Sequence, residues 1–188
     1  IMSDLKVPIR PDDHIQGDPK AVVTLVEYGD YQCPYCGEAY PVVKMLQSYF
    51  GKDLCFVFRN FPLTEMHPEA EPAAETAEFA GAHGHYWEAH DALYENQQML
   101  GPPLYAAIVR ALNLSEDELA QALADGTYRP KVQADFEGGV RSGVQGTPTF
   151  FINGYRHQGA HDLGTLAAAI EIYRRRAGAH HGEQRSML

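Results

Sequence analysis

The sequence predicts an α/β protein in which an all-helical segment interrupts a small sheet. Strand-like apolar runs occur near Val22–Tyr28, Leu54–Phe58 and Pro148–Ile152. Residues 64–144, between the second and third runs, show helical patterns without a strand signal. The expected order is therefore strand, helix, strand, a helical insertion, then two strands and a closing helix.

Residues 21–63 form the first part of the predicted sheet domain. After the first strand, a helix is expected from about Cys33 to Tyr49, with Pro41 inside it. Proline in a helix removes a backbone donor and clashes with the preceding turn, so it should kink the helix. Residues 1–20 are polar and rich in proline and aspartate, which predicts an arm that leads into the first strand.

The insertion, residues 64–144, and the rest of the sheet domain follow. Helices are expected near residues 72–83, 85–99, 103–112 and 115–124. The last of these begins with a capping box at Ser115–Glu118. Residues 145–177 complete the sheet domain, with a hairpin signal at Asn153-Gly154 and a closing helix over Leu163–Arg176. Residues 178–188 lack periodicity, which predicts a mobile tail.

Composition argues against several classes of partner. With a net charge of −10, the chain has no basic stripe for nucleic acid or for an anionic membrane surface. No apolar segment approaches the roughly 20 residues that a membrane span needs. Three cysteines do not make the disulfide framework of a small secreted domain, and Cys55 is interpreted as a buried, inert thiol.

The compartment is predicted from the N-terminus. Met2-Ser3-Asp4 resembles a native start, and no signal-peptide pattern precedes the predicted fold. We therefore expect a cytoplasmic protein. If a signal peptide had been removed from the sequence, the protein would instead be periplasmic.

The pair of thiols in Cys33-Pro34-Tyr35-Cys36 is the most informative motif. It follows the first strand and opens the first helix, where unpaired N–H groups and the helix dipole stabilise a thiolate. Thiolate is the form that attacks a disulfide, so this position favours redox chemistry. The same spacing also occurs in half of a zinc site, and only the placement after a strand favours the redox interpretation.

A second motif, Gly146-Thr147-Pro148-Thr149, precedes the third strand. Proline within a sheet is disfavoured, and a cis peptide bond before Pro148 would explain its presence there. Such a bond would expose the backbone of Thr147 beside the cysteines, where an extended substrate peptide could pair with it. A trans proline that begins a strand is the ordinary alternative, and the cysteine motif makes it the less favoured one.

The chain resembles the DsbA-like thiol:disulfide oxidoreductases of the thioredoxin superfamily, over about residues 15–176. The resemblance implies a thioredoxin fold with an inserted helical domain. It implies that Cys33 is the attacking thiol, Cys36 the buried resolving thiol, Pro148 the facing cis-proline and Glu27 a buried acid that exchanges a proton with Cys36. It rests on Val26–Cys36, Arg59-Asn60-Phe61-Pro62-Leu63 and Gly146–Gly154.

Tyr35 departs from the best-known DsbA proteins, which carry histidine at this place, whereas Pro34-Tyr35 resembles the dipeptide of glutaredoxins. Tyrosine brings no cation, so the Cys33 thiolate should be less stabilised than in strongly oxidising relatives. The reduction potential is expected between about −120 mV for DsbA and about −270 mV for thioredoxin. The physiological direction of electron flow stays open.

Two histidines and an arginine are weaker candidates for functional residues. His83 and His90 could share a helix face, as metal ligands do, but surface histidines are the more ordinary interpretation. Arg59 could bias the nearby acidic site or simply cap the end of the second strand. Neither pattern assigns a function by its spacing.

Three functional hypotheses follow. The first is an enzyme that exchanges disulfides with protein or peptide thiols through Cys33 and Cys36, with Pro34, Tyr35 and Thr147 at the substrate. It needs no cofactor beyond its own dithiol, and its redox partner would be another protein or glutathione. The second is a glutathione-linked reductase with the same fold. The third, ranked lowest, is a non-enzymatic metal-binding module.

Overall fold

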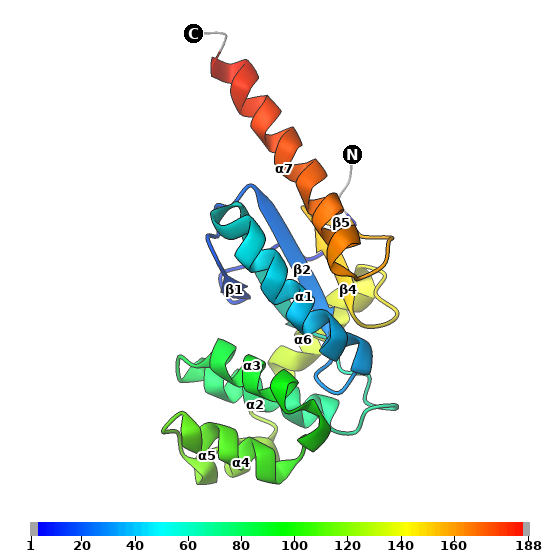
Figure 1. Cartoon of the computed structure of the whole chain (residues 1–188). Coiled ribbons are helices and arrows are strands. Elements are labelled where there is room, and N and C mark those ends of the chain that lie inside the picture. Colours follow the sequence, from blue (N-terminus) through cyan, green and yellow to red (C-terminus); the bar gives the residue numbers. More distant parts are fainter. Residues whose placement is uncertain (1–3, 186–188) are drawn as a thin grey trace.

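The apolar runs form the strands of one five-stranded sheet in the computed structural model, which describes residues 4–185, with side chains through residue 179. Strands β2 and β3 pair in parallel, and the remaining neighbours in the sheet pair antiparallel. The strand order is β1-β3-β2-β4-β5 (Figure 1). The strands are β1 (His14–Gln16), β2 (Val23–Gly29), β3 (Leu54–Asn60), β4 (Thr149–Ile152) and β5 (Tyr155–Arg156).

Helices cover both faces of this sheet because its central strands are buried on both sides. One face packs on α1, Pro34–Phe50, and on α7, Leu163–Arg185. The other face packs on α6, Arg129–Arg141, and on the N-terminal arm, through Phe61, Phe151 and their neighbours. The alternation of side chains along β2 therefore decides which residues reach the cysteines on the α1 face.

The inserted helices gather at one end of the sheet, beside the start of α1 (Figure 1). The expected helix start at Ser115 is confirmed, since Ser115 Oγ accepts a hydrogen bond from the Glu118 backbone N–H at 3.1 Å, which is the N-cap half of a capping box. The block contains α2 (Ala70–Ala82), α3 (Tyr86–Glu95), the short 3-10 helix η2 (Gln97–Met99), α4 (Pro102–Ala111) and α5 (Glu116–Asp125). The α/β class with a helical insertion is thus confirmed.

Three boundaries differ from the sequence-based expectation. The arm contains a short strand, β1, which pairs with the edge of β3 and is too short to show a period of its own. The helix expected over residues 85–99 breaks at Asn96, which leaves the helical backbone. The closing helix continues past Arg176 to Arg185, and no proline interrupts the segment that follows Arg176. Residues 186–188 of the expected tail lie outside the described residues.

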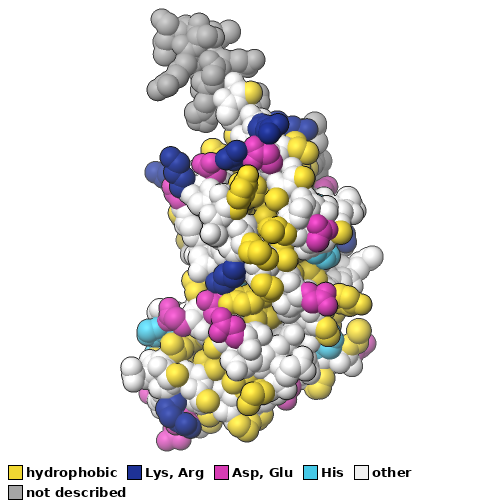
Figure 2. All heavy atoms as spheres, in the orientation of Figure 1, with side chains coloured by type: hydrophobic (Ala, Val, Ile, Leu, Met, Phe, Trp, Pro, Cys, Tyr) yellow, Lys and Arg dark blue, Asp and Glu magenta, His cyan; other side chains and the backbone are white. Residues whose placement is uncertain are grey.

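The surface is mostly polar but carries an apolar strip. Figure 2 shows hydrophobic side chains gathered over the middle of the face that α1 presents, with acidic side chains beside them. Met45 and Tyr49 on α1 are exposed by 46% and 73%. Within residues 4–185, no helix combines the length and the apolar character that crossing a membrane requires.

Candidate active site

Cys33 and Cys36 lie at the N-terminus of α1, directly after the loop that follows β2. Cys33 is the N-cap residue, with an extended backbone, and Pro34 fills the first helical position, where its missing N–H costs nothing. Cys36 sits in the first turn and is completely buried, whereas Cys33 keeps 3% of its surface. Cys33 is therefore the more accessible thiol, although it is itself nearly buried, because the cis-proline loop packs on it.

The two thiols have opposite electrostatic environments. A hydrogen bond from Cys36, helped by the backbone N–H groups of Cys36 and Tyr35 and by Thr147, lowers the pKa of Cys33 to about 5. Burial raises the pKa of Cys36 well above its usual value, and the neighbouring Cys33 and Glu27 raise it further. At neutral pH the pair therefore holds one thiolate, on Cys33, and one thiol, on Cys36.

The loop before β4 faces this pair. The Thr147-Pro148 peptide bond is cis. It places the carbonyl oxygen of Thr147 3.5 Å from Cys33 Sγ. Pro148 is buried and Thr147 is half-buried. A free strand-like edge beside the reactive sulfur is the arrangement that an extended peptide can pair with.

Glu27 lies on β2 under the same end of α1. It is 3% exposed, and its Oε1 atom has no hydrogen-bond partner within the described residues. Burial, followed by the charge of Cys33, raises the pKa of Glu27 to about 8. The carboxyl group is therefore mostly protonated at neutral pH and can give a proton to a neighbouring thiolate.

Asp30, which the sequence did not single out, holds the loop that carries Cys33. Its carboxylate is fully buried and accepts hydrogen bonds from the backbone N–H groups of Gln32, Cys33 and Leu63. His67 Nδ1 lies 2.8 Å from the same carboxylate. An aspartate directly after a strand, at the start of a turn, is the local pattern that could have indicated this role.

Gln97, from η2, ties the helical insertion to the active-site loop. Its Nε2 group donates to the carbonyl oxygens of Tyr31 and Cys33, each at 2.8 Å. A β-carbon added to Gly37, next to Cys36, would lie only 2.3 Å from Gln97 Oε1. The absence of a side chain at Gly37 therefore makes room for this contact, which no local sequence pattern could show.

The weaker candidates have structural partners. The expectation that His83 and His90 share a helix face is wrong, because α2 ends at His83 and His90 belongs to α3. His83 Nδ1 donates to the Phe79 carbonyl oxygen, and buried His90 shares a 2.8 Å hydrogen bond with the hydroxyl of Tyr31. Burial lowers the pKa of His90 well below its usual value, so it is neutral. Cys55 is buried on the opposite face of the sheet.

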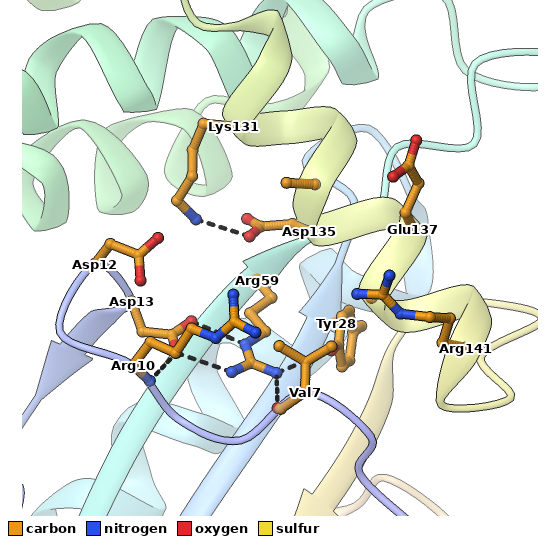
Figure 3. A pocket seen from close by; sticks show the side chains of 12 residues that line it. Val7, Arg10, Asp12, Asp13, Tyr28, Arg59, Lys131, Asp135, Glu137 and Arg141 are labelled. Atoms are coloured by element: carbon orange, nitrogen blue, oxygen red, sulfur yellow. Dashed lines mark hydrogen bonds and ion pairs between the residues drawn. The ribbon is translucent and has the colours of Figure 1, made fainter.

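Arg59 also has a role that neither sequence interpretation anticipated. It points away from the dithiol into a cavity of about 260 Å³ between the arm and α6 (Figure 3). There it pairs with Asp13 and donates to the backbone carbonyls of Val7 and Pro8. Arg59 therefore fastens the N-terminal arm to the end of β3.

Three exposed apolar side chains lie in the dithiol motif or on segments that hydrogen-bond to its loop. Tyr35 lies between the two cysteines and is 69% exposed. Met66 is 72% exposed and follows Leu63, whose backbone N–H donates to Asp30. Met99 is 68% exposed and lies two residues after Gln97. We call Tyr35, Met66 and Met99 the apolar rim. Within the described residues, no group of three or more histidine, cysteine, aspartate or glutamate side chains is arranged to hold a metal ion.

Comparison with known proteins supports the fold and the family. The chain matches the family described as thioredoxin over residues 10–172. It is similar to the solved structure of alpha-DsbA1 from Wolbachia pipientis, with a TM-score of 0.81, 22% identity and coverage of 95% of this chain and 99% of that one. For BdbD from Bacillus subtilis, in its oxidised form, the TM-score is 0.78, with 24% identity and coverage of 86% and 92%. The predicted thioredoxin fold with a helical insertion is confirmed.

Two further similarities have higher identity. A thioredoxin-like oxidoreductase from Silicibacter pomeroyi is 26% identical, with a TM-score of 0.72 and coverage of 88% of this chain and 94% of that one. The Na(+)/H(+) antiporter NhaA 1 of Salinispora arenicola is 45% identical over 168 residues. That match covers 89% of this chain but only 26% of the antiporter, so the chain spans about a quarter of that relative.

Proposed function

Since the chain belongs to the thioredoxin family, we propose that it is an enzyme, a thiol:disulfide oxidoreductase that acts on protein substrates through Cys33 and Cys36. The observation that carries the proposal is the division of charge between the two sulfurs. The pKa of Cys33 is lowered to about 5 while that of its neighbour Cys36 is raised. Such a pair favours one nucleophile and one protonated resolving thiol.

In the oxidising direction, a substrate thiolate attacks Sγ of Cys33 in the Cys33–Cys36 disulfide. A substrate–Cys33 disulfide forms, and Cys36 leaves as a thiolate. A second substrate thiolate then attacks the substrate sulfur of this mixed disulfide, which creates the substrate disulfide and releases the Cys33 thiolate. The low pKa makes Cys33 the better leaving group, so the reduced enzyme is stabilised and its disulfide is oxidising.

Glu27 supplies the proton that the leaving Cys36 needs. The Cys36 thiolate is unstable in its buried position, and the nearby carboxyl group, with a pKa of about 8, is protonated at neutral pH. In the reducing direction the Glu27 carboxylate takes the proton back from Cys36 before Cys36 attacks the mixed disulfide. The two directions thus use one proton and the same two residues.

A protein substrate suits the surroundings of the dithiol better than a small one. The apolar rim of Tyr35, Met66 and Met99 exposes large side chains on the segments joined to the dithiol loop, whereas the Cys33 thiol is itself nearly closed. Exposed apolar side chains that gather at one site typically mark contacts with other proteins. The half-buried Thr147, whose carbonyl oxygen lies beside Cys33 Sγ, offers a strand-like edge for an unfolded or extended segment of substrate.

The test compares single-cysteine variants of the full chain. We expect Cys33→Ser to abolish reduction of insulin and oxidative refolding of a reduced protein, because the attacking sulfur is gone. Cys36→Ser should trap mixed disulfides with substrate, detectable by mass spectrometry. Cys55→Ser, on the opposite face of the sheet, is the matched control and should keep activity. Full activity of both Cys33→Ser and Cys36→Ser would reject the mechanism.

Two alternatives remain to be separated by measurement. A glutathione-linked reductase would turn over a small glutathione mixed disulfide in strong preference to a protein disulfide. A metal-binding module would retain stoichiometric zinc on both thiols after purification without chelator, which elemental analysis detects. The ion transport named for the antiporter relatives is a property of those proteins, of which the match covers 26% in the Salinispora arenicola antiporter.

A further inference from the structure

A shallow hollow shares residues with the cis-proline loop that contacts the reactive cysteine. It has a volume of about 340 Å³ and lies between the cis-proline loop and the segment that joins β5 to α7. Its wall includes Thr147 and Pro148, and the carbonyl oxygen of Thr147 also contacts Cys33 Sγ at 3.5 Å. We call it the cis-proline hollow, lined chiefly by Thr147, Pro148, Arg156, His157, Gln158 and His161.

The hollow differs in charge from the rest of the molecule. The chain has 25 acidic and 15 basic residues. None of the residues that line this hollow is acidic, whereas one arginine and two histidines line it. The cavity of Figure 3 shows the contrast, because its Arg59 and Lys131 each pair with an aspartate inside it. Among its lining residues the hollow thus carries one permanent positive charge, on Arg156, and no acidic side chain.

The donors in the hollow retain hydrogen-bonding capacity. Arg156 is half-buried, and its Nη1 group donates to the Gly143 carbonyl oxygen at 2.7 Å, which fixes the guanidinium. Within residues 4–179, its side chain makes no ion pair; the nearby Asp4 accepts from its backbone N–H instead. His157 uses Nε2 to donate to the Ala160 carbonyl oxygen, while exposed His161 packs against Phe150.

A substrate peptide would bring its own side chains to this hollow. A chain that pairs with the backbone of Thr147 runs extended, with about 3.4 Å between successive residues. Residues next to the attacked cysteine therefore lie within reach of the hollow that shares Thr147 and Pro148 with the thiol. A fixed, partly buried guanidinium with free N–H donors recognises a carboxylate in preference to a neutral or cationic group.

We propose that the cis-proline hollow is a specificity subsite for a carboxylate of the substrate, placed within one or two residues of the cysteine that Cys33 attacks. The subsite rests on the proposed function, since it selects among substrates of the same reaction. Two sources carry this chemistry: an aspartate or glutamate beside the cysteine of a protein substrate, or the carboxylates of glutathione. Arg156 is the principal donor, and Gln158 lies at the exposed edge of the hollow.

The test uses the reduced full chain and short peptides whose single cysteine is joined to thionitrobenzoate. The Cys33 thiolate attacks the peptide sulfur, the peptide–thionitrobenzoate bond breaks, and the coloured thiolate leaves. The peptides carry glutamate, glutamine or lysine on either side of the cysteine. Each rate is divided by the rate of the same peptide with a small free thiol, which removes differences in intrinsic reactivity.

We expect the wild-type protein to prefer the glutamate peptide over the glutamine peptide by about fivefold, as one partly exposed charge pair allows. Arg156→Gln should bring that ratio within about twofold of unity, whereas Arg156→Lys retains part of it because the charge is kept. Gln158→Glu, at an exposed position, should reverse the preference toward lysine. Arg110→Gln, which changes the net charge equally on an exposed helix of the insertion, should leave the ratio unchanged.

The outcomes separate the subsite from the reaction itself. Equal ratios in wild type and in Gln158→Glu would overturn the subsite, even if Arg156→Gln fails to fold. Reaction of no peptide at all would reject the proposed function instead. If glutamate and glutamine peptides react alike but the glutathione–thionitrobenzoate disulfide slows in Arg156→Gln, the carboxylate belongs to glutathione.

Discussion

Replacing Glu27 by glutamine tests whether the buried carboxyl group is protonated in the folded protein. Burial raises the pKa of Glu27 from 4.5 to about 8. At pH 7 the folded protein therefore holds a proton that the unfolded chain has released. Between pH 4.5 and the pKa of Glu27 in the folded protein, the free energy of unfolding therefore falls by about 1.4 kcal/mol for each pH unit.

The expected size follows from these values. The carboxyl group should cost no stability below about pH 4.5, about 3 kcal/mol at pH 7, and a constant, larger amount above pH 8. Glutamine has the same shape and no charge, so Glu27→Gln should remove this dependence and gain about 3 kcal/mol between pH 4 and pH 7. The amide lacks a partner just as Glu27 Oε1 does, so the pH dependence of the gain is more diagnostic than its value at one pH.

The assay is urea denaturation of both proteins in the oxidised state at several pH values between 4 and 9. Oxidation removes the Cys33 charge, the smaller of the two causes of the raised pKa of Glu27, so this assay measures burial alone and the gain should lie below the value of about 3 kcal/mol worked for the reduced protein. Glu38→Gln, at an exposed position on α1, is the control and should change stability by less than about 0.5 kcal/mol. A gain for Glu27→Gln that is the same at pH 4 and pH 7 would show that Glu27 does not titrate as the structure requires.

Three further predictions concern other contacts. Tyr35→His should make the disulfide more oxidising by about 30 mV or more against glutathione buffers, because it places a cation near the Cys33 thiolate; a more reducing or unchanged potential contradicts this. Gly37→Ala should cost about 1–3 kcal/mol in urea denaturation, yet be neutral or stabilising when Gln97→Ala removes the side chain it meets; additive effects would show that the two residues do not interact. Arg59→Met should cost about 3–5 kcal/mol by leaving a buried partner unpaired, whereas Arg129→Met, at an exposed ion pair, should cost under about 1 kcal/mol.

Local patterns of the sequence were sufficient for the centre of the site. Cys33 and Cys36 share the first turn of one helix, and Pro148 directly precedes a strand, so their neighbours in sequence already limit their geometry. The alternation of β2 places Glu27 on the face that α1 covers. The compartment, and the mobility expected of residues 178–188, stay predictions.

Contacts between distant segments could not be predicted in the same way. Gln97 reaches the carbonyl oxygens of Tyr31 and Cys33 from a short helix more than sixty residues away, and only the packing of the insertion brings them together. The same is true of Arg59, whose partners lie on an arm that the sequence left without structure. Such contacts depend on tertiary geometry, and the residue types involved are ordinary on any surface.

The fit between Gly37 and Gln97 has a consequence for how freely the parts of this fold can be exchanged. The insertion occupies, through one amide, the space where a β-carbon of α1 would stand. A helical block transplanted from this protein into another thioredoxin fold would meet that β-carbon unless the recipient also has glycine directly after its second cysteine. We therefore expect the two positions to change together among homologues, with a shorter side chain at 97 wherever position 37 is alanine or larger. We therefore expect the helical insertion to be compatible only with a sheet domain that has glycine at the position of Gly37.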